Sequence, residues 1–203
     1  FFNPGENIPW NRVVKMMREQ TQLAEQADFT TVWLTEHHFA HNGYLNAPPN
    51  PIMMSCDLAA HSKKIRVGQA PIVLPDWHPL RVAEDIALLD NMTEGRVDFG
   101  AARGINERVT LQFNIEADRR DNEKSYRLFI ESLDIILKAW TETAFTHKGE
   151  FYEFPVPGWK ETNRFLMPLE EEYHNKDGEY SAMYVHPRPY QQPHPPVWLM
   201  SNA

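Results

Sequence analysis

Segments whose apolar residues recur three and four positions apart alternate along the chain with short apolar runs. The recurring spacing predicts amphipathic helices, because residues at these intervals share one helical face. The helices are expected over Trp10–Ala27, Ile52–His61, Pro79–Asn91 and Asp121–Trp140. The short runs predict buried strands. The strands are expected over Thr30–Leu34, Ile65–Leu74, Arg96–Ala101 and Val197–Met200, with Phe1-Phe2 as the end of another.

Two stretches interrupt this alternation. Two short β-prone runs flank Lys148-Gly149 within Phe145–Phe154, which predicts a hairpin. Residues 155–196 are irregular, acidic at Glu170-Glu171-Glu172 and rich in proline towards the end. We interpret 155–192 as an insertion before the fifth strand, and we expect it to face the substrate.

The alternation of strands and helices is typical of an α/β domain with a parallel sheet. Such a sheet is either open and doubly wound or closed into a (β/α)₈ barrel. A barrel typically needs about 250 residues, whereas this chain has 203. We therefore expect one domain over residues 1–203 that holds at most the first five β/α units of a barrel.

Composition narrows the function classes. The 20 basic and 28 acidic residues give a formal net charge of −8, which argues against binding nucleic acid or an anionic membrane. No apolar run approaches the roughly 20 residues of a membrane helix. The single cysteine, Cys56, excludes an internal disulfide and a cysteine-rich zinc site. Because no signal peptide is recognisable, we expect a cytoplasmic protein.

The candidate chemistry lies where the predicted strands end, because parallel α/β folds place their active sites at the carboxyl ends of the strands. Three segments follow predicted strands and carry polar groups. They are Glu36-His37-His38-Phe39, Pro75-Asp76-Trp77-His78-Pro79 and Ala102-Arg103-Gly104. All three are expected to face one rim of the sheet.

The first of these segments offers histidines that can act as general acids or bases near neutral pH. Two other interpretations stay open. In one, the histidines cap the strand end by hydrogen bonding; in the other, they bind a metal ion with Glu36 and His41. The metal interpretation is disfavoured, since the helical spacing of a metalloprotease motif is missing. We expect no metal at this site.

Arg103 follows the small residues Gly100-Ala101-Ala102. Small side chains let a flat ligand approach the backbone, and a guanidinium can pair with a phosphate at two points. The alternative is a structural salt bridge at the rim. The Ala70-Pro71 pair inside a predicted strand is unusual, because proline removes a donor from the strand ladder. A bulge, a cis bond or an early end of the strand would explain it.

The chain resembles the bacterial luciferase-like flavin-dependent monooxygenases, including the alkanal monooxygenase alpha chain, in two long runs. These are TTVWLTEHHF at Thr30–Phe39 and VGQAPIVLPDWHPLRVAEDIALLDNMTEGRVDFGAARG at Val67–Gly104. Shorter matches are YEFP at Tyr152–Pro155 and PPVWLMSNA at Pro195–Ala203. The resemblance spans almost the whole chain, and the HPxRxAED pattern from His78 is long and specific.

This resemblance implies a (β/α)₈ barrel that binds reduced FMN, or in a sister branch the deazaflavin F420, at the carboxyl ends of its strands. It implies that His37 is catalytic and that Arg103 contacts the flavin phosphate. The other residues expected at the cofactor are Ala70, Pro71, Ala102, Ile105, Asn202 and Ala203. Relatives have a cis peptide bond at the position of Ala70-Pro71, behind the flavin ring.

The implied reaction is a monooxygenation, in which reduced FMN from a flavin reductase and O₂ oxygenate a small apolar aldehyde or ketone. We expect Glu36, Phe39 and Trp77 to line the substrate pocket, and Trp33 and Phe99 to add apolar walls. Ala102 stands where bacterial luciferase has a reactive cysteine, so light emission is not implied.

Two other functions stay open. An F420-dependent oxidoreductase would transfer a hydride without using oxygen. A non-catalytic partner subunit is disfavoured, because the chain keeps both His37 and Arg103. Relatives often dimerise through the helices after the second and third strands, so we expect a homodimer or heterodimer.

Overall fold

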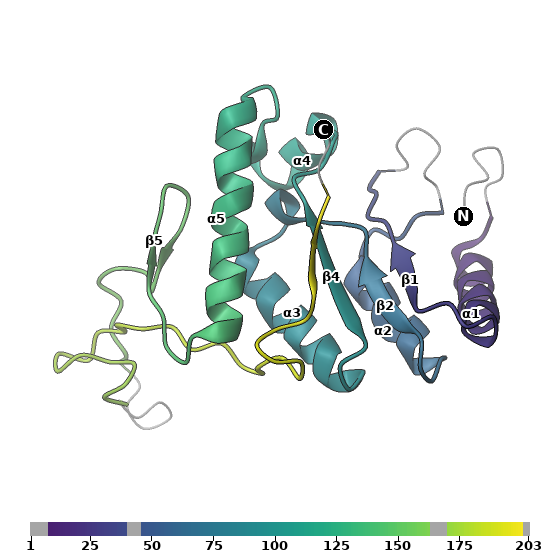
Figure 1. Cartoon of the computed structure of the whole chain (residues 1–203). Coiled ribbons are helices and arrows are strands. Elements are labelled where there is room, and N and C mark those ends of the chain that lie inside the picture. Colours follow the sequence, from purple (N-terminus) through teal and green to yellow (C-terminus); the bar gives the residue numbers. More distant parts are fainter. Residues whose placement is uncertain (1–7, 40–45, 163–169, 201–203) are drawn as a thin grey trace.

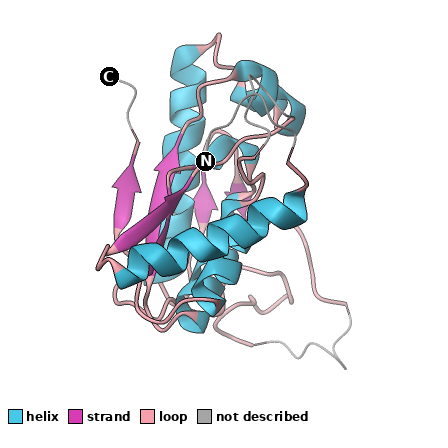
Figure 2. Ribbon diagram, turned by 90° about the vertical axis from the view of Figure 1, so that its right-hand side faces the viewer, coloured by secondary structure: helices cyan, strands magenta, loops and turns pink. Residues whose placement is uncertain are grey.

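The computed structural model describes residues 8–39, 46–162 and 170–200 of the chain. A parallel sheet lies at its centre, with helices packed on one of its faces (Figure 1, Figure 2). The strands of this sheet are β1 (Thr31–Leu34), β2 (Arg66–Gln69), β3 (Ile72–Val73), β4 (Val97–Ala102) and β7 (Val197–Leu199). The helices are α1 (Trp10–Gln26), α2 (Pro51–Ala60), α3 (Pro79–Met92), α4 (Glu107–Phe113) and α5 (Asn122–Thr141), with short 3₁₀ turns η2 (Leu74–Asp76) and η3 (Ile115–Ala117).

The strands run in the order β1-β2-β4-β3, and β7 also pairs with β4. Each of these pairings is parallel; Trp33 lies beside Gly68, and Phe99 lies beside Val197. The predicted α/β class with a parallel sheet is confirmed. Over the described residues the sheet is open, as expected for the first units of a barrel.

The four predicted helices are confirmed as α1, α2, α3 and α5, and each observed end lies within one residue of the predicted end. Capping explains where they begin. The Asn50 side chain accepts a hydrogen bond of 2.8 Å from the Met53 N–H at the start of α2, and Asp121 accepts one of 3.0 Å from the Lys124 N–H at the start of α5. The chain leaves α3 through Gly95, which has φ of 87°, a conformation that glycine adopts readily.

The strand predicted over Ile65–Leu74 is divided into β2 and β3 by a cis peptide bond between Ala70 and Pro71. The expectation of a cis bond at this place is therefore confirmed. Directly opposite, the backbones of β2 and β4 approach each other closely. A Cβ at Gly100 would come within 1.8 Å of the Gln69 carbonyl oxygen, so this position requires glycine.

The hydrophobic core lies between the sheet and the helices α3 and α5. Phe99 of β4 is fully buried and meets Trp140 of α5 edge to face, with ring centroids 5.1 Å apart. Trp140 Nε1 also donates to the Ala83 carbonyl of α3 at 2.9 Å, which ties both helices to one strand. The expectation that Phe99 forms a wall of the ligand pocket is wrong, because alternation along β4 points it towards the helices.

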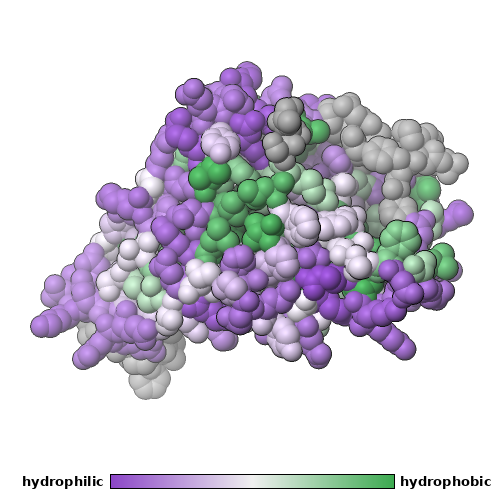
Figure 3. All heavy atoms as spheres, in the orientation of Figure 1, coloured by the Kyte–Doolittle hydropathy of each residue, from purple (hydrophilic) through white to green (hydrophobic). Residues whose placement is uncertain are grey.

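The sheet is exposed at its β7 edge. The last predicted strand forms as β7, but Trp198 and Leu199 are 51% and 58% exposed, so the expectation of a buried strand is wrong. Trp33 of β1 crosses above Gly68 and meets Trp198 with ring centroids 5.6 Å apart. A hydrophobic patch is visible around β7 (Figure 3). Among the described strands β7 pairs only with β4, and its successive side chains point to opposite faces, so its position at the edge of the sheet explains why both Trp198 and Leu199 are exposed.

The predicted hairpin is confirmed as the antiparallel pair β5 (His147–Lys148) and β6 (Glu153–Phe154). Glu131 of α5 anchors it, because its carboxylate accepts hydrogen bonds from the backbone N–H groups of Glu150, Phe151 and Tyr152 at 2.9–3.2 Å.

The described part of residues 155–196 contains isolated bridges but no longer strand or helix. It lies at the end of α5 that is distant from α4 (Figure 1). The carboxyl ends of the strands lie at the other end, so the expectation that this segment faces the substrate is wrong for its described residues. No helix of the described chain combines the length and hydrophobicity needed to cross a bilayer.

Candidate functional site

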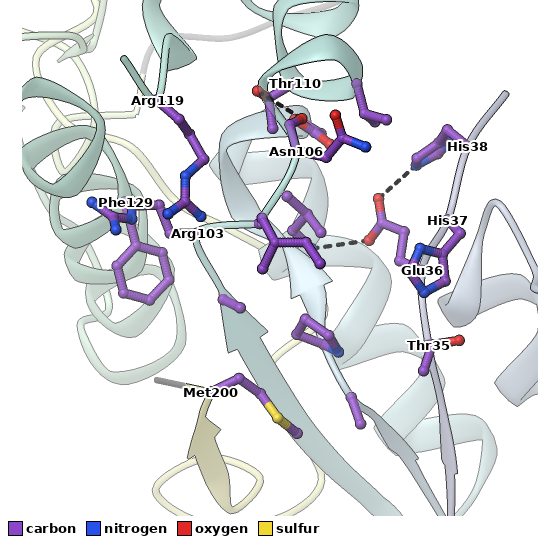
Figure 4. Close-up of a pocket in the computed structure, with 18 of the residues that line it drawn as sticks. Thr35, Glu36, His37, His38, Arg103, Asn106, Thr110, Arg119, Phe129 and Met200 are labelled. Carbon is purple, nitrogen blue, oxygen red and sulfur yellow. Dashed lines mark hydrogen bonds and ion pairs between the residues drawn. The ribbon is translucent and has the colours of Figure 1, made fainter. Parts of the chain in front are cut away.

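A cavity of about 820 Å³ lies at the carboxyl ends of β1, β3 and β4 (Figure 4). This volume falls within the roughly 300–1,000 Å³ typical of small-molecule sites. Its lining comes from the segments that follow β1, β2 and β4, from α4 and α5, and from the end of β7. The three strand ends singled out in the sequence therefore meet around one space.

Most of the predicted site residues line this cavity, namely Glu36, His37, Ala70, Pro71, Ala102, Arg103 and Ile105. Phe39 and Trp77 do not. Phe39 is 58% exposed and stacks on Phe113, with ring centroids 5.4 Å apart. Trp77 packs against the core and donates from Nε1 to Glu36 at 2.8 Å. The expected positions Asn202 and Ala203, and His41 of the metal interpretation, lie outside the described residues.

Two guanidinium groups line one side of the cavity. Arg103 follows β4, and its Nη1 donates to the main-chain and side-chain oxygens of Asn122 at 2.9 and 2.8 Å. Arg119 comes from the turn between η3 and α5 and points towards the same side (Figure 4). We call these two residues the arginine pair. Gly104, with φ of 79°, turns the chain away directly after Arg103.

The arginine pair brings two positive charges to one wall of the cavity. Partial burial and then the neighbouring Arg103 charge lower the pKa of Arg119, and the Glu107 charge opposes them, although a guanidinium stays protonated in proteins. Among the described residues, neither arginine forms a salt bridge with a carboxylate. The alternative of a structural salt bridge at Arg103 therefore has no support within the described residues. Two like charges brought together at a cavity wall favour an anionic ligand.

The opposite side of the cavity carries Glu36, His38 and Asp76, which we call the Glu36 cluster. The Glu36 side chain is fully buried and accepts three hydrogen bonds. The donors are the Val73 N–H at 2.9 Å, Trp77 Nε1 at 2.8 Å and His38 Nε2, the ring nitrogen that faces the carboxylate, at 2.8 Å. These bonds fix the segment after β1 against β3 and η2. Glu36 was expected to line the substrate pocket; it does border the cavity, but its carboxylate is committed to this network.

His37 lies on the same side of the cavity as the Glu36 cluster and is partly buried (Figure 4). Its main-chain N–H donates to the Pro48 carbonyl at 3.4 Å, which helps to hold the loop after β1. His37 and the arginine pair therefore face each other across one space. A ligand with an anionic end and a reactive end would span that distance.

Several lining residues are not among those predicted, including Asp76, Asn106, Thr110, Arg119, Tyr126, Phe129, Ile130 and Met200. Asp76 belongs to a strand-end segment that the sequence already marks. Arg119 has no such signal, because Arg120 follows it directly and the sequence does not distinguish the two. The conformation of the turn before α5 gives them different positions. Arg120 pairs with Asp118 at 2.6 Å, while Arg119 faces the cavity.

Comparison with known proteins gives consistent results. The family model described as luciferase-like monooxygenase matches residues 3–202. The chain is 36% identical over 143 residues to the alkanal monooxygenase alpha chain of the Kryptophanaron alfredi symbiont, covering 70% of this chain and 38% of that protein. It is 28% identical over 186 residues to the oxygenase component of a flavin-dependent trigonelline monooxygenase from Acinetobacter baylyi, covering 92% and 42%.

Among solved structures, the oxygenating constituent of 3,6-diketocamphane monooxygenase from Pseudomonas putida, in complex with FMN, superposes with a TM-score of 0.72. The sequence identity is 19%, and the match covers 96% of this chain and 48% of that one. This likeness confirms the predicted luciferase-like barrel fold. The chain spans less than half the length of each of these three relatives.

Proposed function

The chain belongs to the luciferase-like monooxygenase family, and we propose that it supplies the FMN-binding site of a two-component oxygenase. The reaction uses reduced FMN and O₂ to oxygenate a small apolar aldehyde or ketone. Two relatives are described as an oxygenase component and as an oxygenating constituent in complex with FMN. A separate flavin reductase is therefore the expected partner, and the oxygenase is expected to be a homodimer or heterodimer.

One observation carries the proposal: the arginine pair meets at a cavity whose far side holds His37. A phosphate monoester brings up to two negative charges and three acceptor oxygens, which two guanidinium groups can bind bidentately. Its binding removes the repulsion between Arg103 and Arg119. The donor set of this cavity wall therefore fits the phosphate end of FMN.

The wall between these two sides suits a flat ring. The cis bond between Ala70 and Pro71 and the small side chain of Ala102 border the cavity without filling it. Ile105 is 66% exposed and comes from the segment beside the arginine pair. We assign Ala70, Pro71 and Ala102 to the ring and Ile105 to the phosphate end, and we propose Asn202 and Ala203 as further contacts there.

We assign His37 the role of holding and moving a proton at its imidazole, across the cavity from the arginine pair. When bound, reduced FMN supplies the electrons with which O₂ is activated. An imidazole titrates near neutral pH, so His37 can exchange a proton with the reacting groups. Glu36 and Trp77 hold the wall behind it, and Phe39 is assigned to the rim through which the substrate enters.

A comparison of two histidine variants tests this proposal. The protein is loaded anaerobically with reduced FMN, mixed with O₂ and a panel of aldehydes and ketones, and the oxygenated product is quantified. His37→Ala is expected to lower product formation by about 10²- to 10⁴-fold while FMN affinity changes little. His186→Ala, in a described segment that does not line the cavity, serves as the matched control.

Unchanged turnover in His37→Ala would remove His37 from the reaction. Hydride transfer with F420 and no consumption of O₂ would contradict the monooxygenase proposal and favour the deazaflavin reaction. Failure of the protein to bind either cofactor would contradict both.

A further inference from the structure

The Glu36 cluster contains a carboxyl group that the proposed reaction does not use. Asp76 ends η2, between β3 and α3, and both of its carboxyl oxygens are buried. Among the described residues neither oxygen has a hydrogen-bond partner. Leaving an ionised carboxylate buried and unpaired is costly, so this group needs either a proton or a compensating charge.

The immediate neighbours of Asp76 are Glu36 and His38. One polar atom from each of the three side chains lies within 4.8 Å of the others, and all three residues line the cavity. Glu36 already accepts three hydrogen bonds. Three donors therefore reach the Glu36 carboxylate, whereas no described donor reaches either oxygen of Asp76.

Two carboxylates this close in a buried place cannot both ionise easily. Because Glu36 holds the donors, the proton resides on Asp76. Burial is the largest influence and, with the Glu36 charge, it raises the pKa of Asp76 to about 7, while His38 acts in the opposite direction.

The charges that act on Asp76 come from one segment, which follows β1. Helices α4 and α5 pack against η2, but among the described residues the charges that act on Asp76 are those of Glu36 and His38. The other ionisable groups lining the cavity are His37, Arg103, Arg119 and Tyr126. The arginine pair lies across the cavity (Figure 4).

We propose that Asp76 is a proton-holding positioning residue, which keeps the Glu36 cluster at one negative charge and sets the charge that this wall presents to a ligand. In the protonated state, Asp76 is neutral, and its buried carboxyl group adds no charge to the cluster. In the deprotonated state, a second negative charge lies within 4.8 Å of the His38 ring nitrogen. The cluster is thus a proton store on the cavity wall, and this assignment does not depend on which ligand binds.

Infrared spectroscopy tests the proton directly. Wild-type protein is expected to show the C=O stretch of a protonated carboxyl at pH 6 and to lose it by about pH 8.5. Asp76→Asn should lack this band, Asp76→Glu should retain a band that depends on pH, and Asp85→Asn on α3 should match the wild type. Absence of the band from the wild type, or its persistence in Asp76→Asn, would overturn the proposal.

The effect of the Asp76 charge on the neighbouring His38 ring provides a second measurement. A merely structural role of Asp76 would not change this signal. In ¹⁵N spectra of the histidine rings, the His38 signal of the wild type is expected to shift as Asp76 titrates, and Asp76→Asn should remove that shift. The ring of His61, at the far end of α2, is the control. An identical His38 titration in the wild type and in Asp76→Asn would contradict the coupling.

The consequence for the cofactor rests on the proposed function. The anionic form of a reduced flavin ring is repelled by a second negative charge on this wall, so binding of that form should weaken by about tenfold from pH 6 to pH 8.5 as Asp76 ionises. Asp76→Asn should flatten this dependence. A flat profile in a wild type that binds reduced FMN would overturn this consequence. If reduced FMN does not bind, the proposed function fails, and the infrared band still decides the assignment of Asp76.

Discussion

The two sides of the cavity are built in opposite ways. The Glu36 cluster is buried, and its central carboxylate is held by donors from β3, from the segment after η2 and from the loop after β1. The arginine pair lies on chain segments that leave the sheet, and Arg103 is held by Asn122 alone among the described residues. The Glu36 cluster is therefore part of the fold, whereas the arginine pair can bind a ligand that brings negative charge.

The comparison predicts that substitutions on the first side affect stability and that substitutions on the second side affect binding. Glu36→Ala should show the largest effect. It leaves the Val73 N–H and Trp77 Nε1 without an acceptor in a buried place. We expect the free energy of unfolding in urea to fall by about 3–5 kcal/mol.

Arg103→Ala is the matched variant on the other side, and it should change the free energy of unfolding by no more than about 0.5 kcal/mol. A similar loss in both variants would break the comparison, because the arginine pair would then also be part of the fold.

The pH dependence of stability should differ between wild type and Asp76→Asn. The pKa of Asp76 is raised to about 7, so the folded state keeps a proton that the unfolded state releases above the ordinary pKa of an aspartic acid. Stability should therefore fall as pH rises through this window and level off above pH 7, by at most about 1.4 kcal/mol per pH unit. Asp76→Asn should lack this decline. Equal slopes in urea unfolding from pH 5 to pH 8 would contradict the assignment.

The neighbouring arginines Arg119 and Arg120 sharpen the comparison further. Arg119 lines the cavity, whereas Arg120 pairs with Asp118 on the surface. Arg119→Ala should weaken FMN binding by about 1.5–3 kcal/mol, the contribution of a hydrogen bond to a charged group, or at least tenfold in Kd. Arg120→Ala should leave Kd within about twofold of the wild type. Equal losses measured by titration calorimetry would remove Arg119 from the anion site.

The sequence predicts the long elements because their periodicity is strong. The helices α1, α3 and α5 carry apolar stripes over many turns, and packing on the sheet depends on those stripes. Helix α4, over Glu107–Phe113, is only seven residues long, and its two buried residues give no readable period. The exposure of β7 also could not be predicted, since an apolar run does not reveal whether an element covers it.

The site follows the same division. The rule that polar groups at strand ends meet on one rim brings Glu36, Asp76 and Arg103 to the same cavity. Arg119 lies outside any strand end, and its role depends on how the turn before α5 directs two adjacent arginines. The sequence also does not reveal that the Glu36 carboxylate accepts three hydrogen bonds. Two of the donors are distant in sequence, because Val73 belongs to β3 and Trp77 follows η2.

The relative affinity for FMN and riboflavin is the most direct test of the account, because the two ligands share the ring and differ in the phosphate. Equilibrium binding of both should be measured for the wild type and for Arg103→Ala. The account predicts that the substitution weakens FMN binding at least tenfold and leaves riboflavin binding nearly unchanged. Equal losses for the two ligands would contradict it, because the arginine pair would then not hold a phosphate.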